Sequence, residues 1–208
     1  MQFSLLLALL ASADWGQFRG PNASGVSSDT NLPAELRPDR NVLWQTTLPP
    51  GYSSPSVAVD RVFVTAVAGE KLLTIAMDRA SGKILWRREA PRPRQQEMQR
   101  ANSPASATPA TDGSRVYSFF QDFGLIAYGP DGNDLWRMPM GPFNNPFGHG
   151  SSPILTPGGG TLIMNIDQDT GSFLLGSTPS PARPCGARRA IMPSAVMPRP
   201  SSMANRSL

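Results

Sequence analysis

Few side chains in this sequence are of the types that do acid–base, nucleophilic or metal chemistry. His149 is the only histidine, and it lies between Gly148 and Gly150 in the stretch NPFGHGSSP. A metal site needs several ligands, and no cysteine or carboxylate lies beside His149, so we predict no metal there. Because functional residues are often found on loops, His149 is a candidate functional loop residue, with a structural or surface role as the alternative.

Other motifs that could carry chemistry are better explained as turns. Asp167 and Asp169 suggest a calcium loop, but further oxygen ligands and a closing Glu are missing, so we predict a hairpin turn at 169–171. The GGG at 158–160 lacks the Lys-Ser/Thr of a phosphate loop, and no G-x-S-x-G nucleophile motif occurs. The sequence therefore predicts no catalytic residue and no metal site.

The most informative pattern is AMDRASGKILW at residues 76–86. Asp78 and Ser81-Gly82 suit a tight turn, in which Asp caps backbone amides and Gly tolerates a positive φ. The strand that follows alternates, so Leu85 and Trp86 lie on opposite faces. A buried tryptophan contributes a large apolar area and needs a partner for its N–H. We interpret Ala76, Asp78, Ser81, Gly82 and Trp86 as a docking motif between repeated units.

Similar units recur along the chain. Three segments (53–91, 106–142 and 151–176) each open with Ser or Thr before Pro and continue into two apolar strands. The second closes with a shorter copy of the motif, AYGPDGNDLW, in which Asp131-Gly132 is the turn and Trp136 the closing ring. Trp44 is expected in the outer strand of a preceding unit. A period of about 40–50 residues with several short strands indicates β-propeller blades.

These motifs resemble the eight-bladed propellers with pyrroloquinoline-quinone-type repeats, whose blades share the docking pattern A-x-D-x-x-T-G-x-x-x-W, here with Ser81 for Thr. The opening DWGQFRGPNASGVS, residues 14–27, resembles the N-termini of exported bacterial proteins with this repeat. The resemblance implies an all-β fold, a partial β-propeller of four-stranded antiparallel blades with tryptophan-docking motifs. About two and two-thirds blades are present.

The ends of the chain differ in composition from its middle. Residues 1–13 carry an apolar run before Ala-Ser-Ala, which predicts a signal peptide cleaved before Asp14. Residues 14–176 form the predicted partial propeller. Residues 177–208 are rich in Pro, Ser and Arg and are predicted to be a disordered or frameshifted tail. If the codons are regrouped by one base from Gly176, they permit GLDAKSGKTLW, which aligns with AMDRASGKILW without a gap.

Composition excludes several classes of protein. Gly 19 and Pro 22 with only 16% charged residues suit a turn-rich β protein. The tail holds five arginines and no acid, more than the whole net charge of +4, so no basic face for nucleic acid is implied. The single cysteine, Cys185, excludes an internal disulfide, and no apolar run is long enough for a transmembrane helix. The basic stretch 87–100 is predicted to be a solvated loop between blades.

The resemblance implies a non-enzymatic binding or scaffold module, periplasmic or secreted, that holds protein partners or a small ligand through its propeller loops. No cofactor is expected for such a module. The alternative is a fragment of a pyrroloquinoline-quinone-dependent alcohol or sugar dehydrogenase, which would need that quinone and calcium and, in many members, adjacent cysteines. A sugar-binding or hydrolase-associated propeller stays open as a third interpretation.

Overall fold

The structure of the chain is a computed structural model that describes residues 15–179, so the predicted signal peptide, Cys185 and most of the tail lie outside the described residues. The first sheet is a meander of four antiparallel strands, β1 (Ser56–Ala58), β2 (Arg61–Ala68), β3 (Lys71–Asp78) and β4 (Ile84–Ala90). The second repeats it with β5 (Ala110–Thr111), β6 (Val116–Phe120), β7 (Gly124–Tyr128) and β8 (Asp134–Pro139). The third has β9 (Ile154–Leu155), β10 (Leu162–Ile166) and β11 (Phe173–Ser177).

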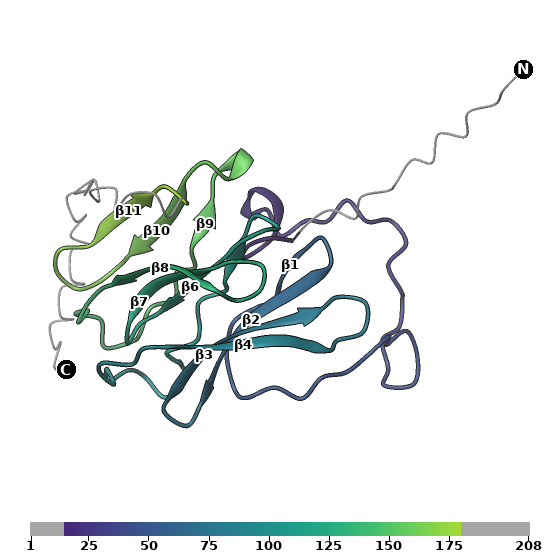
Figure 1. The fold of residues 1–208 in the computed structure, drawn as a ribbon, viewed down its shortest axis with the longest axis horizontal. Helices are drawn as coiled ribbons and strands as arrows, with labels where there is room; N and C mark the ends of the chain where they lie inside the picture. Colours follow the sequence, from purple (N-terminus) through teal and green to yellow (C-terminus); the bar gives the residue numbers. More distant parts are fainter. Residues whose placement is uncertain (1–14, 180–208) are drawn as a thin grey trace, which may run out of the picture.

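The three sheets stack side by side as blades 1, 2 and 3 (Figure 1). In the described residues the only helical pieces are two short 3-10 turns, η1 (Pro21–Ala23) and η2 (Pro157–Gly159). None of the described helices is long and apolar enough to cross a membrane. The prediction of an all-β partial propeller with four-stranded antiparallel blades is therefore confirmed, with three strands seen in blade 3.

The burial pattern follows from the stacking of blades. Every residue of β6 and β7 in the middle blade is buried, because both faces of that sheet are covered. Strand β4 alternates instead, with Leu85 exposed and Trp86 buried, as the sequence predicts. A short strand that is covered on both faces is apolar along its whole length. In an outer strand, buried and exposed residues alternate with a period of two.

A register shift occurs at the same place in the first two blades. Ala76 lies opposite Trp86, and the pairing of β3 with β4 shifts immediately after Ala76. Ala127 lies opposite Trp136 in the same way, with the shift of β7 against β8 just after it. Both alanines are fully buried. A small residue at this position leaves space beside the large ring across the strand pair, which gives Ala76 a physical role in the motif.

Each interface between blades is an apolar cluster. Blades 1 and 2 share one that contains Phe63, Leu72, Trp86, Phe120 and Tyr128. Within it, the hydroxyl of Thr74 donates to that of Ser118 at 2.8 Å, so two buried polar groups satisfy each other. A second cluster joins blades 2 and 3 through β6, β7, β10 and β11, with members such as Tyr117, Phe119, Leu162, Met164 and Leu175.

The far face of blade 1 is covered by the preceding segment. Trp44 and Leu48 pack on its buried residues, among them Val62 and Ile75. The prediction placed Trp44 in an outer strand, but residues 42–49 are not part of any strand that the structure describes. Within residues 15–179 no strand pairs with this segment, so its side chains pack without a ladder.

Trp86 is expected to stabilise the contact of blades 1 and 2. Trp86→Ala removes a ring that is 8% exposed and leaves a cavity against Phe63 and Tyr128, which should lower the free energy of unfolding by about 3–5 kcal/mol. Leu85→Ala, on the exposed face of the same strand, should cost about 0.5 kcal/mol or less. Urea unfolding followed by circular dichroism measures both, and equal losses for the two variants would contradict this assignment.

Candidate functional site

Three tryptophan side chains contact the turn of the following blade. Trp44 Nε1 donates to the carbonyl of Arg79 at 2.9 Å, and Trp86 Nε1 donates to that of Pro130 at 2.9 Å. Trp136 Nε1 donates to the carbonyl of Pro179 at 3.4 Å. These carbonyls lie in equivalent turns, after the third strand of each blade. Each ring therefore buries its apolar surface and satisfies its N–H on the neighbouring blade.

Glycine is required beneath the first two rings. A Cβ on Gly82 would lie 2.3 Å from the Trp44 ring, and one on Gly132 would lie 2.8 Å from the Trp86 ring. Both glycines have a positive φ, of 70° and 75°. The sequence motif is thus divided between two contacts, since the glycine of one blade receives the tryptophan of the blade before it.

The turn of blade 1 is built as the sequence suggests. Asp78 Oδ1 accepts hydrogen bonds from the hydroxyl of Ser81 at 2.5 Å and from its backbone N–H at 2.8 Å. These bonds lower the pKa of the Asp78 carboxyl below its usual value. In blade 2 the Asp131 carbonyl instead accepts from Arg88 at 3.0 Å. Asp131 thus contributes its backbone to the contact between blades.

A further contact of this interface has no counterpart in the predicted motif. The residue two positions after Trp44 and after Trp86 bonds the same turn as the ring. Thr46 Oγ1 donates to the Gly82 carbonyl at 2.7 Å, and Arg88 Nε donates to the Gly132 carbonyl at 2.6 Å. The i, i+2 spacing after Trp is the signal that could have identified them.

The stretch that follows β4 is not simply a solvated loop. Arg92 Nε donates to Asp122 Oδ2 at 2.8 Å, and the Gln96 backbone N–H donates to the other carboxylate oxygen at 3.0 Å. The Asp122 side chain is fully buried. Gln96 also bonds both backbone groups of Phe143. The prediction of a solvated loop is therefore wrong for Arg92 and Gln96, because their partners Asp122 and Phe143 lie 26 to 47 residues away in sequence.

His149 lies in the interface of blades 2 and 3 and is 4% exposed. Its ring meets Phe119 and Phe143 edge-on, with centroids 5.5 and 4.4 Å away. Its backbone N–H donates to Gln121 Oε1 at 2.8 Å, while neither ring nitrogen has a hydrogen-bond partner among the described residues. Burial lowers the pKa of His149, and the carboxylate of Asp167 opposes that effect. This environment favours a structural role for the candidate loop residue.

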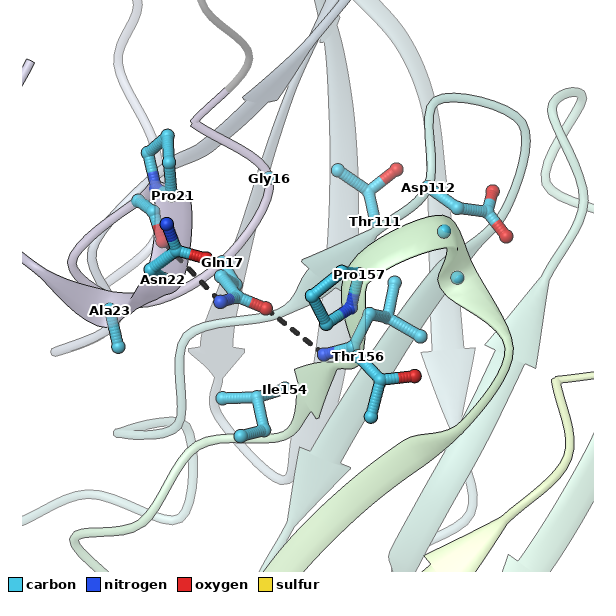
Figure 2. Close-up of a pocket in the computed structure, with 14 residues that line it drawn as sticks. Gly16, Gln17, Pro21, Asn22, Ala23, Thr111, Asp112, Ile154, Thr156 and Pro157 are labelled. Atoms are coloured by element: carbon cyan, nitrogen blue, oxygen red, sulfur yellow. Dashed lines mark hydrogen bonds between the residues drawn. The ribbon is translucent and has the colours of Figure 1, made fainter.

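One cavity lies where the N-terminal segment meets the first strands of blades 2 and 3 (Figure 2). Its volume is about 650 Å³, and its walls include Gln17, Asn22, Thr111, Ile154 and Pro157. A smaller, more polar hollow of about 350 Å³ adjoins Tyr52, Arg92 and Asn102. Neither cavity includes His149 or a residue of the docking motif.

Within residues 15–179 there is no group of three or more His, Cys, Asp or Glu side chains that could hold a metal ion. Asp167, one of the two carboxylates with calcium-like spacing, accepts a hydrogen bond from the Ser172 hydroxyl at 3.1 Å. Asp169 donates its backbone N–H to the Asn144 carbonyl at 2.8 Å. Both residues belong to the connection between β10 and β11.

Comparison with known proteins identifies one family. A family model described as outer membrane protein assembly factor BamB matches residues 26–145. No curated protein matches the chain. Among solved structures, BamB from Moraxella catarrhalis is 19% identical with a TM-score of 0.44, and the match covers 65% of this chain and 36% of that one.

Two further structures are dehydrogenases. A europium-containing methanol dehydrogenase is 14% identical with a TM-score of 0.46, and the match covers 64% of this chain and 23% of that one. A quinohemoprotein alcohol dehydrogenase from Pseudomonas putida HK5 is 13% identical with a TM-score of 0.45, and 64% and 19% of the two chains are covered. The chain spans well under half the length of each of these three proteins.

Stacked antiparallel blades of this kind define a partial β-propeller. Since the family model matches more than half of the chain, the chain belongs to the family of PQQ-like repeat propellers described as outer membrane protein assembly factor BamB.

The pH dependence of stability should report the burial of His149. An unfolded histidine has a pKa of about 6.5, and burial lowers this value in the folded chain. The unfolded state therefore binds the proton first as the pH falls, so folded stability should decrease as the pH falls through about 6.5 and below. His149→Leu should abolish this loss between about pH 7.5 and 5.5. Urea midpoints measure it, and a wild-type curve that is flat over this interval would contradict the burial of a neutral ring.

Proposed function

We propose that the chain is part of an exported binding or scaffold module that acts in the periplasm or outside the cell, and not an enzyme. The observation that carries the proposal is the family match over residues 26–145, whose description names an assembly factor of outer membrane proteins. The signal-like residues 1–13 support export. Protein partners, or a small ligand, would be held by the loops at the two ends of the blades.

The use of two carboxylates, the buried Asp122 and the half-buried Asp112 at the wall of the 650 Å³ cavity, supports a scaffold. Asp112 accepts hydrogen bonds from the backbone of Ser114 and Arg115 and from the Tyr117 hydroxyl. Asp122 accepts from Arg92 and from the backbone of Gln96. An acid or base in catalysis must be within hydrogen-bond reach of a substrate. Here the carboxylate oxygens are directed at the protein itself, where they fasten turns and loops to blade 2.

In a pull-down assay, the full-length product of the gene is expected to bind outer membrane assembly proteins of the organism that carries the gene. Pyrroloquinoline quinone and calcium added to it should give no change in quinone absorbance and no dye-linked oxidation of alcohols or sugars. A quinoprotein alcohol dehydrogenase treated identically serves as the positive control. A clear signal in either assay would replace the scaffold proposal with the alternative, a fragment of a quinone-dependent alcohol or sugar dehydrogenase.

We also propose that residues 177–208 follow a one-base slip in the reading frame. The support is positional. Trp136 donates to the carbonyl of Pro179 in the same way as Trp44 donates to the carbonyl of Arg79. Position 179 in blade 3 therefore corresponds to position 79 in blade 1. In blade 1 the glycine follows three residues later and the tryptophan seven residues later, at Gly82 and Trp86. The shifted reading GLDAKSGKTLW places Gly at position 182 and Trp at 186, where this chain has Ala182 and Gly186.

Sequencing the gene across codons 165–208 tests the reading frame. The expected result is a single-base difference near codon 176 that restores the Asp, Ser-Gly-Lys and Trp of a complete third blade. Codons that cannot be regrouped to this peptide would show that the tail is genuine. The outcome concerns only the third blade and is independent of the cofactor assay.

A further inference from the structure

The first strands of the three blades lie next to one another. Strand β1 contacts β5, and β5 contacts β9, as strands at the axis of a propeller do. They are the shortest strands of their sheets, with three, two and two residues. Each pairs on one edge with the second strand of its own blade. The opposite edges carry backbone groups that need partners from elsewhere.

The N-terminal segment supplies partners to all three edges. Trp15 pairs with Val57 of β1, with its N–H donating at 2.8 Å and its carbonyl accepting at 2.9 Å. The next residue, Gly16, accepts from the N–H of Thr111 in β5 at 2.7 Å. Gln17 then accepts through its side-chain Oε1 from the N–H of Leu155 in β9 at 3.0 Å. Three consecutive residues thus contact blades 1, 2 and 3 in order.

The segment is folded to fit this position. Its chain turns back on itself through backbone bonds from Gly20 to Gln17 at 2.9 Å and from Gly25 to Arg19 at 2.8 Å. The approach to blade 2 is close, since a Cβ on Gly16 would lie only 2.7 Å from the Thr111 carbonyl oxygen. The purple turn lies beside β1 and β9 in Figure 1, and Figure 2 shows Gln17 directed at the segment that carries Ile154 and Thr156.

We propose that the inner edges of β1, β5 and β9 form one peptide-binding site, and that its ligand is the chain's own segment 15–25, which acts as a clasp. The site recognises the tripeptide Trp-Gly-Gln in an extended conformation. Trp supplies a two-way strand pair, Gly permits close approach, and the Gln amide oxygen reaches the third blade. The clasp forms one wall of the 650 Å³ cavity. The inference does not depend on the proposed function.

These contacts explain how blades with such short first strands keep fixed positions relative to one another. Backbone hydrogen bonds within a blade do nothing to fix its neighbours. The Gln17 to Leu155 bond joins residues 138 apart in sequence. A contact of that span fixes blade 3 relative to the N-terminal segment, and the same tripeptide fixes blades 1 and 2.

Hydrogen exchange of the full chain tests the clasp. In the wild type the amides of Thr111 and Leu155, whose acceptors lie in the clasp, should be protected. Gly16→Val drives a side chain into the Thr111 carbonyl and acts through contact, because Gly16 is not among the positive-φ residues. It should speed exchange at Val57, Thr111 and Leu155 together by about tenfold or more while the β7 amides stay protected. Val26→Ala, on an exposed residue just beyond the clasp, is the matched control.

A second variant keeps the test decisive if Gly16→Val unfolds, and a peptide tests the site itself if Gly16→Val stays folded. Gln17→Leu removes the acceptor of Leu155 and a longer bond, of 3.4 Å, from Gln17 Nε2 to the Gly20 carbonyl within the clasp. It should speed exchange at the Leu155 amide while the amides of Val57 and Thr111 stay protected. A synthetic peptide of residues 15–25, added to Gly16→Val, should bind saturably and restore protection at all three amides, whereas a scrambled peptide should not. Unchanged exchange at Leu155 in Gln17→Leu, or rescue by the scrambled peptide, would overturn the proposal.

Discussion

A blade of this chain has two apolar faces, and every other feature depends on covering both. A four-stranded meander satisfies its own backbone but leaves large side chains on each side. In blade 2 these are covered by blades 1 and 3, so β6 and β7 are buried throughout. Burial of apolar area is the main favourable contribution to folding, so the stack and not the single blade is the stable unit.

The stack is fastened differently at its outer and inner edges. At the outer edge, the Trp86 ring and Arg88 donate to carbonyls of the next turn, where Gly132 makes room. At the inner edge, the tripeptide that begins at Trp15 bonds the first strand of each blade. Between them lie apolar clusters, which are strong but not directional. The hydrogen bonds at the two edges supply the direction, because their geometry tolerates little displacement.

Sequence reasoning succeeded where the signal is local. The turn at Asp78 and the alternation of Leu85 and Trp86 lie within about a dozen residues, and the same short pattern returns in the next unit, so spacing alone indicated the all-β blades. It failed where partners are distant. The sequence predicted a solvated Arg92, because its partner Asp122 lies thirty residues further on, in another blade. Gln17 gave no sign of its bond to Leu155 for the same reason.

The pattern in blade 3 shows what a covered face contributes. In β10 the side chains toward blade 2, Leu162, Met164 and Ile166, are buried, whereas Ile163 is half-buried and Asn165 exposed. The positions in β6 that correspond to Ile163 and Asn165 are Tyr117 and Phe119, and both are buried against blade 3. A following blade would therefore gain apolar burial from Ile163 but would have to provide a hydrogen-bond partner for Asn165, because an amide buried without one is costly. The face of blade 3 thus selects a neighbour with a polar group at that height. Blade 1 makes the same demand of blade 2, because the buried Thr65, at the equivalent position in β2, donates to the carbonyls of Ala105 and Ala107.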